Sequence, residues 1–365
     1  MTFSKWIQQG CEKEDTEPTY VFDLLCSHFY NPLTNEAFTS GICSSTDSAY
    51  RWANNYQENK WSWANARKYF YNGLTLSTKT DRDNALADAF RALGQVVHLV
   101  QDMAVPAHTR LDLHDVLINP DFFEVYTYDN INDLVYDQVP YRGSSLVSSI
   151  QDAPRQLWDG DFYTETSLPV GSNTVGLAEY SAANFFSRDT IFKGQPRPML
   201  SDTDCANKVM NPTLTTSIVQ VPNDSGGFYN GIYISKTVGD QVNMLAAFSI
   251  LKNEIVNTGK DKRLNGDAIC KQLAFTLNLK DDAINEDNAA MLVPRAVGYS
   301  AALMDHFFKS QIEISLPDSG VYASVPNNGS IYPYPNMNFT QITLKAKNVL
   351  LSGEDMSGGL SIITA

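Results

Sequence analysis

The segment Arg82–Met103 constrains the fold of this 365-residue chain more strongly than any other part of its sequence. Its apolar residues recur at positions 85, 86, 89, 90, 93, 96, 97 and 100, close to the 3.6-residue period of an α-helix. Pro106 follows shortly afterwards and cannot continue a helix. We therefore predict one long helix here, and similar patterns at Asp240–Asn257 and Ala289–Lys309 predict two more.

The remainder of the chain up to about residue 312 is also predicted to consist mainly of helices joined by long loops. Trp61 and Trp63, with the aromatic residues 69–71, form a cluster that is typical of core packing on a further helix. Long loops are predicted for the polar stretches rich in Gly, Pro, Asn and Ser, which are 31–48, 139–173 and 193–237.

The pattern changes after residue 312, where Ile312–Leu316, Gly320–Val325 and Phe339–Leu351 are rich in β-forming residues. So few strands cannot make an independent sandwich, and the last four residues of the chain resemble the middle of another strand. We therefore expect a mainly α protein. Its helical domain would span 1–312, and the β-strand segment 313–365 would belong to a truncated β-sandwich.

Charge and cysteine content exclude some classes of protein. The chain has 41 acidic and 27 basic side chains, and its formal net charge of −14 disfavours a polyanion such as nucleic acid as partner. No apolar run approaches the roughly 20 residues that cross a bilayer.

The five cysteines include no Cys-x2-Cys pair, which excludes a zinc ribbon. Their odd, scattered number fits either buried thiols or one or two disulfides in an exported protein.

Histidine is scarce, yet three of the five histidines, His98, His108 and His114, fall within seventeen positions. His98 and Asp102 lie four residues apart on the predicted helix, so their side chains share one face. Pro106 ends that helix and lets His108 turn back towards the same place. An isolated pair of this kind is more often a helix hydrogen bond, but Pro-x-His at this offset favours a metal site. Imidazole and carboxylate are the donors of catalytic zinc sites.

The pattern His-x3-Asp-x3-Pro-x-His resembles the metal-binding signature of the zinc-dependent phospholipase C and S1/P1 nuclease superfamily. This resemblance implies an all-helical enzyme with a cluster of two or three zinc ions, in which His98 and Asp102 bind the first zinc and His108 binds the second. Upstream, Gly10-x4-Asp15 and the segment around His28, Ser-His-Phe-Tyr-Asn-Pro, also resemble the family. By that resemblance Asp15 bridges two zinc ions, and His28 completes the first site.

The second zinc site departs from the family spacing, which places a carboxylate four residues after the histidine. His114 is the next histidine, but position 118 is an isoleucine. We assign Glu124 as the carboxylate, because Asn119 and Pro120 can cap and start a helix that carries it back towards His114. Three further acids compete with it, namely Asp112, Asp115 and Asp121.

The family's third zinc uses the amino group of an N-terminal tryptophan and a nearby histidine. Trp6 is internal, and no histidine precedes His28. We therefore expect that an N-terminal segment is missing from the sequence, in line with its abrupt C-terminal end. No signal peptide is visible, and a removed one would fit a secreted or periplasmic protein.

These observations predict a zinc-dependent phosphodiester hydrolase, phospholipase C-like, in which a metal-bound hydroxide attacks phosphorus and Asp15 orients it. Its expected partners are a phospholipid or other phosphodiester and the surface of a membrane. One alternative is a single-strand nuclease of the S1/P1 type, which needs aromatic platforms and a positive groove. Another is a zinc-stabilised binding protein without activity, which would have no open position on the metal.

Overall fold

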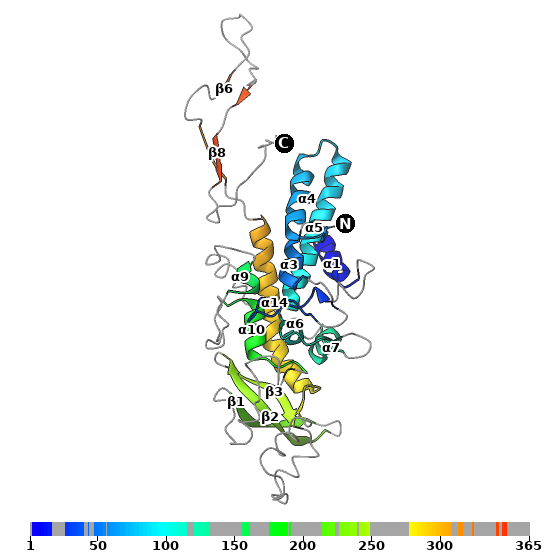
Figure 1. The fold of residues 1–365 in the computed structure, drawn as a ribbon, viewed down its shortest axis with the longest axis vertical. Coiled ribbons are helices and arrows are strands. Elements are labelled where there is room, and N and C mark those ends of the chain that lie inside the picture. Colours follow the sequence, from blue (N-terminus) through cyan, green and yellow to red (C-terminus); the bar gives the residue numbers. More distant parts are fainter. Residues whose placement is uncertain are drawn as a thin grey trace, which may run out of the picture. The chain divides into compact units, whose positions relative to one another are not determined.

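The computed structural model (Figure 1) describes residues 2–16, 26–39, 43, 47–55, 57–114, 120–131, 134, 155–160, 175–188, 190, 214–222, 226–238, 241–248, 277–308, 312–316, 323–324, 341–342 and 345–348. The chain divides into two compact units, Met1–Phe307 and Phe308–Ala365. The described helices are α1 (Phe3–Glu14), α3 (Ala49–Asn54), α4 (Trp63–Thr75), α5 (Lys79–Asp102), α6 (Pro106–Thr109), α7 (Phe122–Asp129), α9 (Arg155–Trp158), α10 (Leu177–Asn184) and α14 (Asp282–Phe308). The prediction of a mainly α protein is confirmed.

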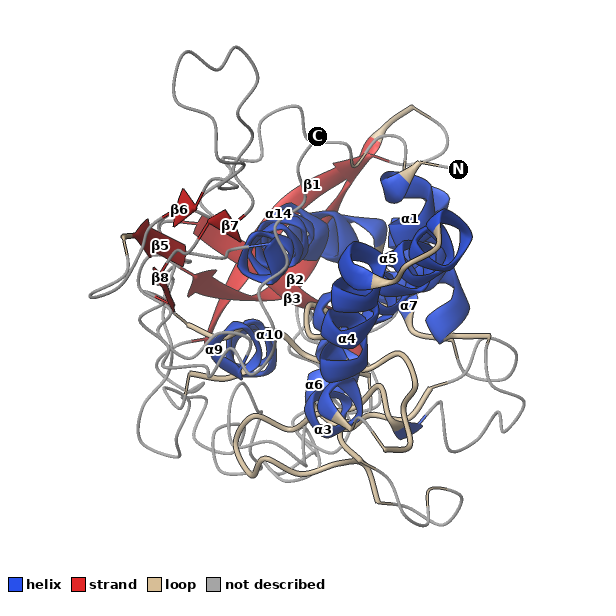
Figure 2. Ribbon diagram, turned by 90° about the horizontal axis from the view of Figure 1, so that it is seen from above, coloured by secondary structure: helices blue, strands red, loops and turns tan. Residues whose placement is uncertain are grey.

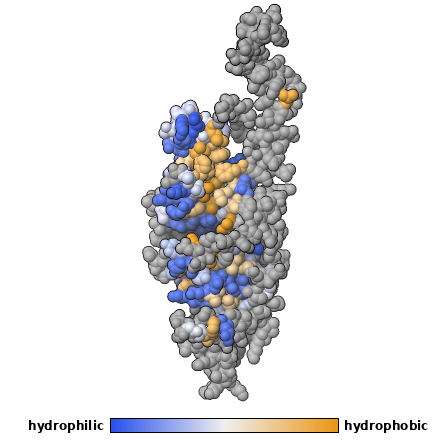
Figure 3. Space-filling model, turned by 180° about the vertical axis from the view of Figure 1, so that it is seen from behind, coloured by the Kyte–Doolittle hydropathy of each residue, from blue (hydrophilic) through white to orange (hydrophobic). Residues whose placement is uncertain are grey.

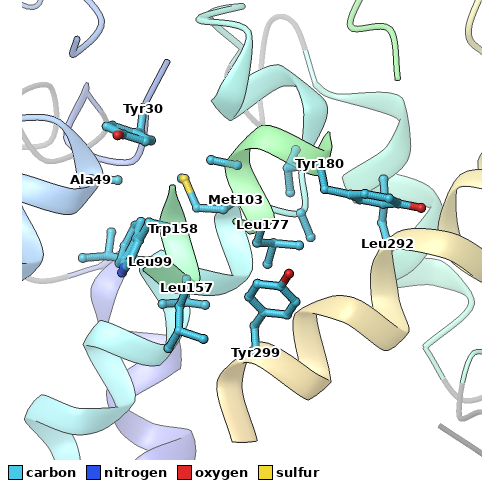
Figure 4. Packing of buried hydrophobic residues seen from close by; sticks show 14 of the residues in the cluster. Tyr30, Ala49, Leu99, Met103, Leu157, Trp158, Leu177, Tyr180, Leu292 and Tyr299 are labelled. Atoms are coloured by element: carbon cyan, nitrogen blue, oxygen red, sulfur yellow. The ribbon is translucent and has the colours of Figure 1, made fainter. Parts of the chain in front are cut away.

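Helix α5 is the long helix that the apolar periodicity predicts. Thr78 caps its start, because the threonine side chain accepts a hydrogen bond from the backbone N–H of Asp81. Its second half is buried on almost every side, and α1 and α4 pack along it (Figure 2). Figure 4 shows Leu99 and Met103 of this helix among the large side chains of the core, which include Trp158 and Leu177.

Helix α1 crosses α5 at two glycines, and this crossing is unusually close. A Cβ atom added to Gly10 would lie 2.1 Å from the main-chain oxygen of Arg91, and one added to Gly94 would lie 2.1 Å from the oxygen of Ile7. The glycines therefore let the two backbones touch. Because Asp15 directly follows α1, this crossing fixes where Asp15 lies relative to the end of α5.

The first unit also contains a sheet that the sequence analysis did not predict. Its strands are β1 (Leu214–Pro222), β2 (Phe228–Val238), β3 (Gln241–Phe248) and β4 (Leu277–Asn278), paired antiparallel in that order. The helix predicted at 240–257 is therefore wrong over β3, and the loop predicted at 193–237 is wrong over β1 and β2. Short apolar runs do not distinguish helix from strand. Pairing of Val238 with Gln241 leaves only Gly239-Asp240 between β2 and β3, which is a hairpin signal.

The second unit contains short antiparallel pairs of strands. Strand β5 (Ile312–Ser315) pairs with β8 (Lys345–Asn348), and β6 (Ala323–Ser324) pairs with β7 (Gln341–Ile342). These strands fall within the three segments predicted to be β-rich. The further strand expected at the last four residues lies outside the described part of the chain, as do most of the loop predicted at 139–173 and residues 249–257.

Some apolar side chains remain exposed on the first unit, and Figure 3 shows apolar and polar areas side by side on one of its faces. Tyr71 and Leu74 are exposed near the end of α4, and Val125, Tyr128 and Ile131 are exposed on and just after α7. None of the helices in the described ranges combines the length and the apolarity that crossing a bilayer requires.

Candidate metal centre

The last turns of α5 carry the first two candidate ligands. His98 and Asp102 face the same side of the helix, and the Nε2 atom of His98 lies 3.4 Å from Oδ1 of Asp102. Asp15 reaches the same place from the end of α1, with its Oδ1 atom 3.3 Å from Nε2 of His98. Asp15 is more than half exposed, whereas Asp102 is buried. One carboxylate therefore closes the site from inside, and the other borders the solvent.

His28 completes this first group from a loop that a disulfide holds. Cys26 and Cys43 form a disulfide. Of the two alternatives that the sequence left open, buried thiols or disulfides, the disulfide therefore holds for this pair. The thiol of Cys11 is free and donates to the carbonyl oxygen of Gly94 at 3.1 Å, while Cys205 and Cys270 lie outside the described residues.

The ring of His28 is buried and points at both carboxylates of the group. Its Nδ1 atom lies 3.6 Å from Oδ1 of Asp15 and 3.8 Å from Oδ2 of Asp102. One ligand atom each from Asp15, His28 and His98 lies within 4.8 Å of the other two, so these residues can hold a metal ion. We call them the first triad.

A second triad consists of His108, His114 and Glu124, whose ligand atoms also lie within 4.8 Å of one another. His108 belongs to α6, the short helix that Pro106 starts. The two oxygens of Glu124 are shared between the histidines, since Oε1 lies 3.0 Å from Nε2 of His108 and Oε2 lies 3.0 Å from Nε2 of His114. The structure therefore brings together all three residues predicted for the second site.

Backbone carbonyls fix which ring nitrogen each histidine of the second triad presents. Nδ1 of His108 lies 3.0 Å from the carbonyl oxygen of His28, and Nδ1 of His114 lies 3.0 Å from that of Asp112. Because Nδ1 donates to a carbonyl oxygen, Nε2 is the nitrogen that each ring would offer to a metal after losing its proton to the solvent. The ring of Phe29 packs against both imidazoles, with centroid distances of 4.9 Å and 5.8 Å.

Helix α7 carries Glu124 into place, but its cap differs from the prediction. Asp121, not Asn119, is the capping residue, and its Oδ1 atom accepts hydrogen bonds from the N–H groups of Phe123 and Glu124 at 3.0 Å and 3.1 Å. Asn119 and the competing Asp115 lie outside the described residues. Asp121 is thus occupied as a cap, and Asp112 offers its main-chain carbonyl to His114.

The two triads adjoin each other through Asp102. Its Oδ2 atom lies 3.8 Å from Nδ1 of His28 and 3.9 Å from Nδ1 of His108. The rings of these histidines are roughly parallel, with centroids 6.1 Å apart. The N–H of Tyr30 also donates to the carbonyl oxygen of His108 at 3.2 Å, so the loop of the first triad and α6 are joined directly.

Three buried polar atoms in the first triad and in the adjoining Asp102 have no hydrogen-bond partner among the described residues. They are Nε2 of His28, Nε2 of His98 and Oδ2 of Asp102. Buried polar atoms are rarely left unsatisfied, because each costs free energy unless a partner is present. A cation beside His98 and Asp102 would satisfy two of these atoms, whereas Nε2 of His28 lies towards Glu14.

Charge and burial shift the pKa values of the histidines in different directions. Burial lowers the pKa of His28 to about 4, although the Asp102 carboxylate opposes this. For His98, burial also favours the neutral ring, but the carboxylates of Asp102 and Asp15 outweigh it and raise the pKa to about 10. Likewise, Glu124 outweighs the burial of His114 and raises the pKa of that ring to about 9.

The carboxylates respond to the same interactions. Burial opposes ionisation of Glu124, but its hydrogen bonds with His108 and His114 hold its pKa far below the ordinary value. The pKa of Asp15 is also lowered, since His98 outweighs the effect of burial. Both carboxylates are therefore ionised at neutral pH, as metal ligands must be.

Glu14 belongs to this site, and the sequence analysis missed it. It is the residue before Asp15 and is almost completely buried, and burial raises its pKa to about 8. Its Oε1 atom accepts a hydrogen bond from Nε1 of Trp52 at 3.1 Å and lies 3.9 Å from Nε2 of His28. The available signal was its spacing of four residues from Gly10, which places both on the buried face of α1.

Seven candidate residues were predicted from the sequence, and the structure brings all seven into one region. They are Asp15, His28, His98, Asp102, His108, His114 and Glu124. The side-chain chemistry and the spacing of the two triads suit metal ions. In comparisons with known proteins, no family model, no curated protein and no solved structure matches the chain.

Proposed function

We propose that this protein is a zinc-dependent phosphodiester hydrolase of the phospholipase C type. The observation that carries the proposal is the pair of adjoining triads, each of histidine and carboxylate. The motif His-x3-Asp-x3-Pro-x-His, which resembles that of the zinc-dependent phospholipase C and S1/P1 nuclease superfamily, supports it independently. Two cations a few ångströms apart suit the displacement of an oxygen at phosphorus.

The donor atoms of the first triad fit zinc in kind and in spacing. Zinc binds imidazole nitrogen and carboxylate oxygen at about 2.0–2.2 Å, so two donors of a tetrahedral site lie about 3.3–3.6 Å apart. Nε2 of His98 lies 3.3 Å and 3.4 Å from oxygens of Asp15 and Asp102, and Nδ1 of His28 lies 3.6 Å from Asp15. These distances exceed those of strong charge-assisted hydrogen bonds. They are those expected of neighbouring zinc ligands.

Each residue has a role in this proposal. His28, His98 and Asp102 would hold the first zinc, His108, His114 and Glu124 would hold the second, and Asp15, which lies beside His28 and His98, would serve as the bridging carboxylate. When bound, zinc lowers the pKa of a water molecule to about 7 and stabilises negative charge on phosphoryl oxygens. Asp15 is ionised and partly exposed, so it could orient a water molecule held by the metal.

A lipid is the favoured substrate, because apolar side chains are exposed on the helix that carries a ligand. Glu124 faces His108 and His114, whereas Val125 and Tyr128 on the same helix are 43% and 80% exposed. Ile131, just beyond the helix, is 62% exposed. Such residues suit contact with acyl chains at a membrane surface. The net charge of −14 disfavours the alternative substrate, a single-stranded nucleic acid.

Metal analysis and an activity assay together test the proposal. Protein purified without chelator should contain at least two zinc ions per chain and should hydrolyse a bis-aryl phosphodiester. Dialysis against a chelator should abolish the activity, and added zinc should restore it. Folded protein with less than one zinc per chain would refute the proposal, whereas two zinc ions without hydrolysis would favour the non-catalytic binding protein.

Variants connect the activity to the proposed ligands. His98→Ala and Asp102→Ala each remove a ligand and leave the partners buried, so both should lose zinc and activity. The matched control is His306→Ala, because His306 lies outside both triads and packs on Trp63. Full zinc content and activity in both site variants would show that the pair on α5 is only structural.

A comparison of substrates tests the preference for lipid. Phosphatidylcholine vesicles should be hydrolysed faster than single-stranded DNA at equal phosphodiester concentration. Tyr128→Asp should slow hydrolysis of the vesicles and leave hydrolysis of the soluble bis-aryl substrate unchanged, since Tyr128 is 80% exposed and supplies no ligand atom to either triad. Preferential cleavage of DNA would instead support the nuclease.

A further inference from the structure

The ring of His28 is oriented differently from the other candidate ligands. His108 and His114 donate from Nδ1 to backbone carbonyls and present Nε2 to their triad. His28 presents Nδ1 instead, which lies 3.6 Å from Asp15 and 3.8 Å from Asp102. Its Nε2 atom therefore points away from the first triad, into the protein.

That Nε2 atom is buried and has no hydrogen-bond partner. Glu14 approaches it most closely among the carboxylates of the described residues, with Oε1 at 3.9 Å. A ring that binds a metal through Nδ1 carries its proton on Nε2, and that proton needs an acceptor. The ring or the carboxylate must move by only about 1 Å to form a normal hydrogen bond.

Glu14 is itself held firmly in place from the opposite side. Nε1 of Trp52 donates to its Oε1 atom at 3.1 Å. The amide of Gln95, in the orientation that satisfies both of its ends, donates to Oε2 at 2.5 Å and accepts from Nε1 of Trp61 at 3.2 Å. Glu14 is 1% exposed, so protein groups rather than water fix its carboxylate.

We propose that Glu14 is a positioning residue that holds His28 with Nδ1 towards the first metal ion. Trp52 and Gln95 orient the side chain of Glu14, its carboxyl oxygen accepts a hydrogen bond from Nε2–H of His28, and the ring is thereby fixed. This inference rests on the metal-binding part of the proposed function. It assigns to Glu14 a role outside the ligand set, since Glu14 acts through His28 and does not bind the ion itself.

The direct test is long-range ¹H–¹⁵N NMR of zinc-loaded protein with labelled histidine, which is tractable because the chain has five histidines. In the wild-type protein, the His28 spectrum should show a metal on Nδ1 and a proton on Nε2. Zinc bound through Nε2 of His28 would overturn the assignment, whether or not any variant folds.

Zinc affinity of a Glu14→Gln variant gives a second test. Loss of such an outer carboxylate weakens metal binding by about 10–100-fold, and we expect this for one of the two ions only. The matched control is Glu179→Gln. Glu179 is another fully buried glutamate, which lies on α10 and accepts from the N–H groups of Gly160, just after α9, and Gly176, the N-cap of α10. It should lower stability and leave both zinc dissociation constants within about twofold, because it touches no ligand.

The outcomes separate this inference from the proposed function. Unchanged zinc affinity in Glu14→Gln, or equal weakening of both sites in Glu14→Gln and Glu179→Gln, would refute the role of Glu14 alone. Wild-type protein that binds two zinc ions and hydrolyses phosphodiesters would still support the proposed function in that case. Wild-type protein that binds no zinc would refute both.

Discussion

Adding one methyl group at Gly94 should separate α1 from α5. A Cβ atom there would lie 2.1 Å from the main-chain oxygen of Ile7 and 2.9 Å from Cα of Gly10, whereas ordinary contacts of Cβ lie at 3.4–4 Å. Both obstacles are backbone atoms, which cannot turn aside as a side chain can. Helix α1 must therefore retreat from α5 by about 1 Å or more in the Gly94→Ala variant.

The size of the effect follows from two opposing terms. Overpacking of this kind costs typically about 1–3 kcal/mol, and a clash of backbone with backbone belongs at the upper end. Alanine gains about 0.5–1 kcal/mol over glycine within a helix. The expected net loss for Gly94→Ala is thus about 2 kcal/mol. Asp15 and Glu14 move with α1, so zinc binding at the first triad should weaken as well.

Gly298→Ala in α14 is the matched control. A Cβ atom at Gly298 would have no neighbour within 4 Å in the described part of the chain, so the gain in helix propensity should dominate. Urea unfolding with chelator, followed by far-UV circular dichroism, should place this variant about 0.5–1 kcal/mol above the wild-type protein. If Gly94→Ala is as stable as Gly298→Ala, α1 and α5 do not cross as described.

Three further predictions concern the site. Glu124→Gln should remove one zinc and lower the rate of hydrolysis by at least about tenfold. Asp121→Asn should change zinc content and rate little, because asparagine also caps helices. Elemental analysis and enzyme kinetics measure these two quantities. Zinc binding at pH 7.5 should release at least two protons, since His98 and His114 have pKa values of about 10 and about 9 and must each lose a proton to bind. Calorimetry in buffers of different ionisation enthalpy counts these protons, and a result of no released protons would contradict the prediction. Cys43→Ser opens a loop of 17 residues and should cost about 3 kcal/mol in urea unfolding, unless the disulfide is absent in solution.

The sequence predicted the helices and the candidate ligands whose signals are local. Helix α5 is long and periodic, and Pro106 marks its end, so both its position and the face that carries His98 and Asp102 follow from the residues alone. The sheet was missed because strands β1 to β3 depend on pairing with one another. Their residues alternate poorly, and a run such as that of Gln241–Phe248 fits a helix equally well.

Glu14 and Asp121 show a different limit of the sequence. Glu14 is identified only by what surrounds it, since Trp52 and Gln95 come from α3 and α5. Asp121 was weighed as a rival ligand because its charge and position suit one, yet its carboxylate caps α7. In both cases the residue type was visible, but its partner was determined by tertiary packing.

The distribution of charge explains how the site can exist both with and without metal. Carboxylates that face one another in a buried site repel unless cations separate them. The carboxylates of Asp102 and Asp15 raise the pKa of His98, and that of Glu124 raises the pKa of His114. Without metal, the protons on these two rings therefore supply the positive charge. The apolar core around α5 contributes separately, since its packing does not involve the ligands. Protons would therefore compete with the proposed metal ions for a site that is already folded, and acidification should release those ions before it unfolds the protein.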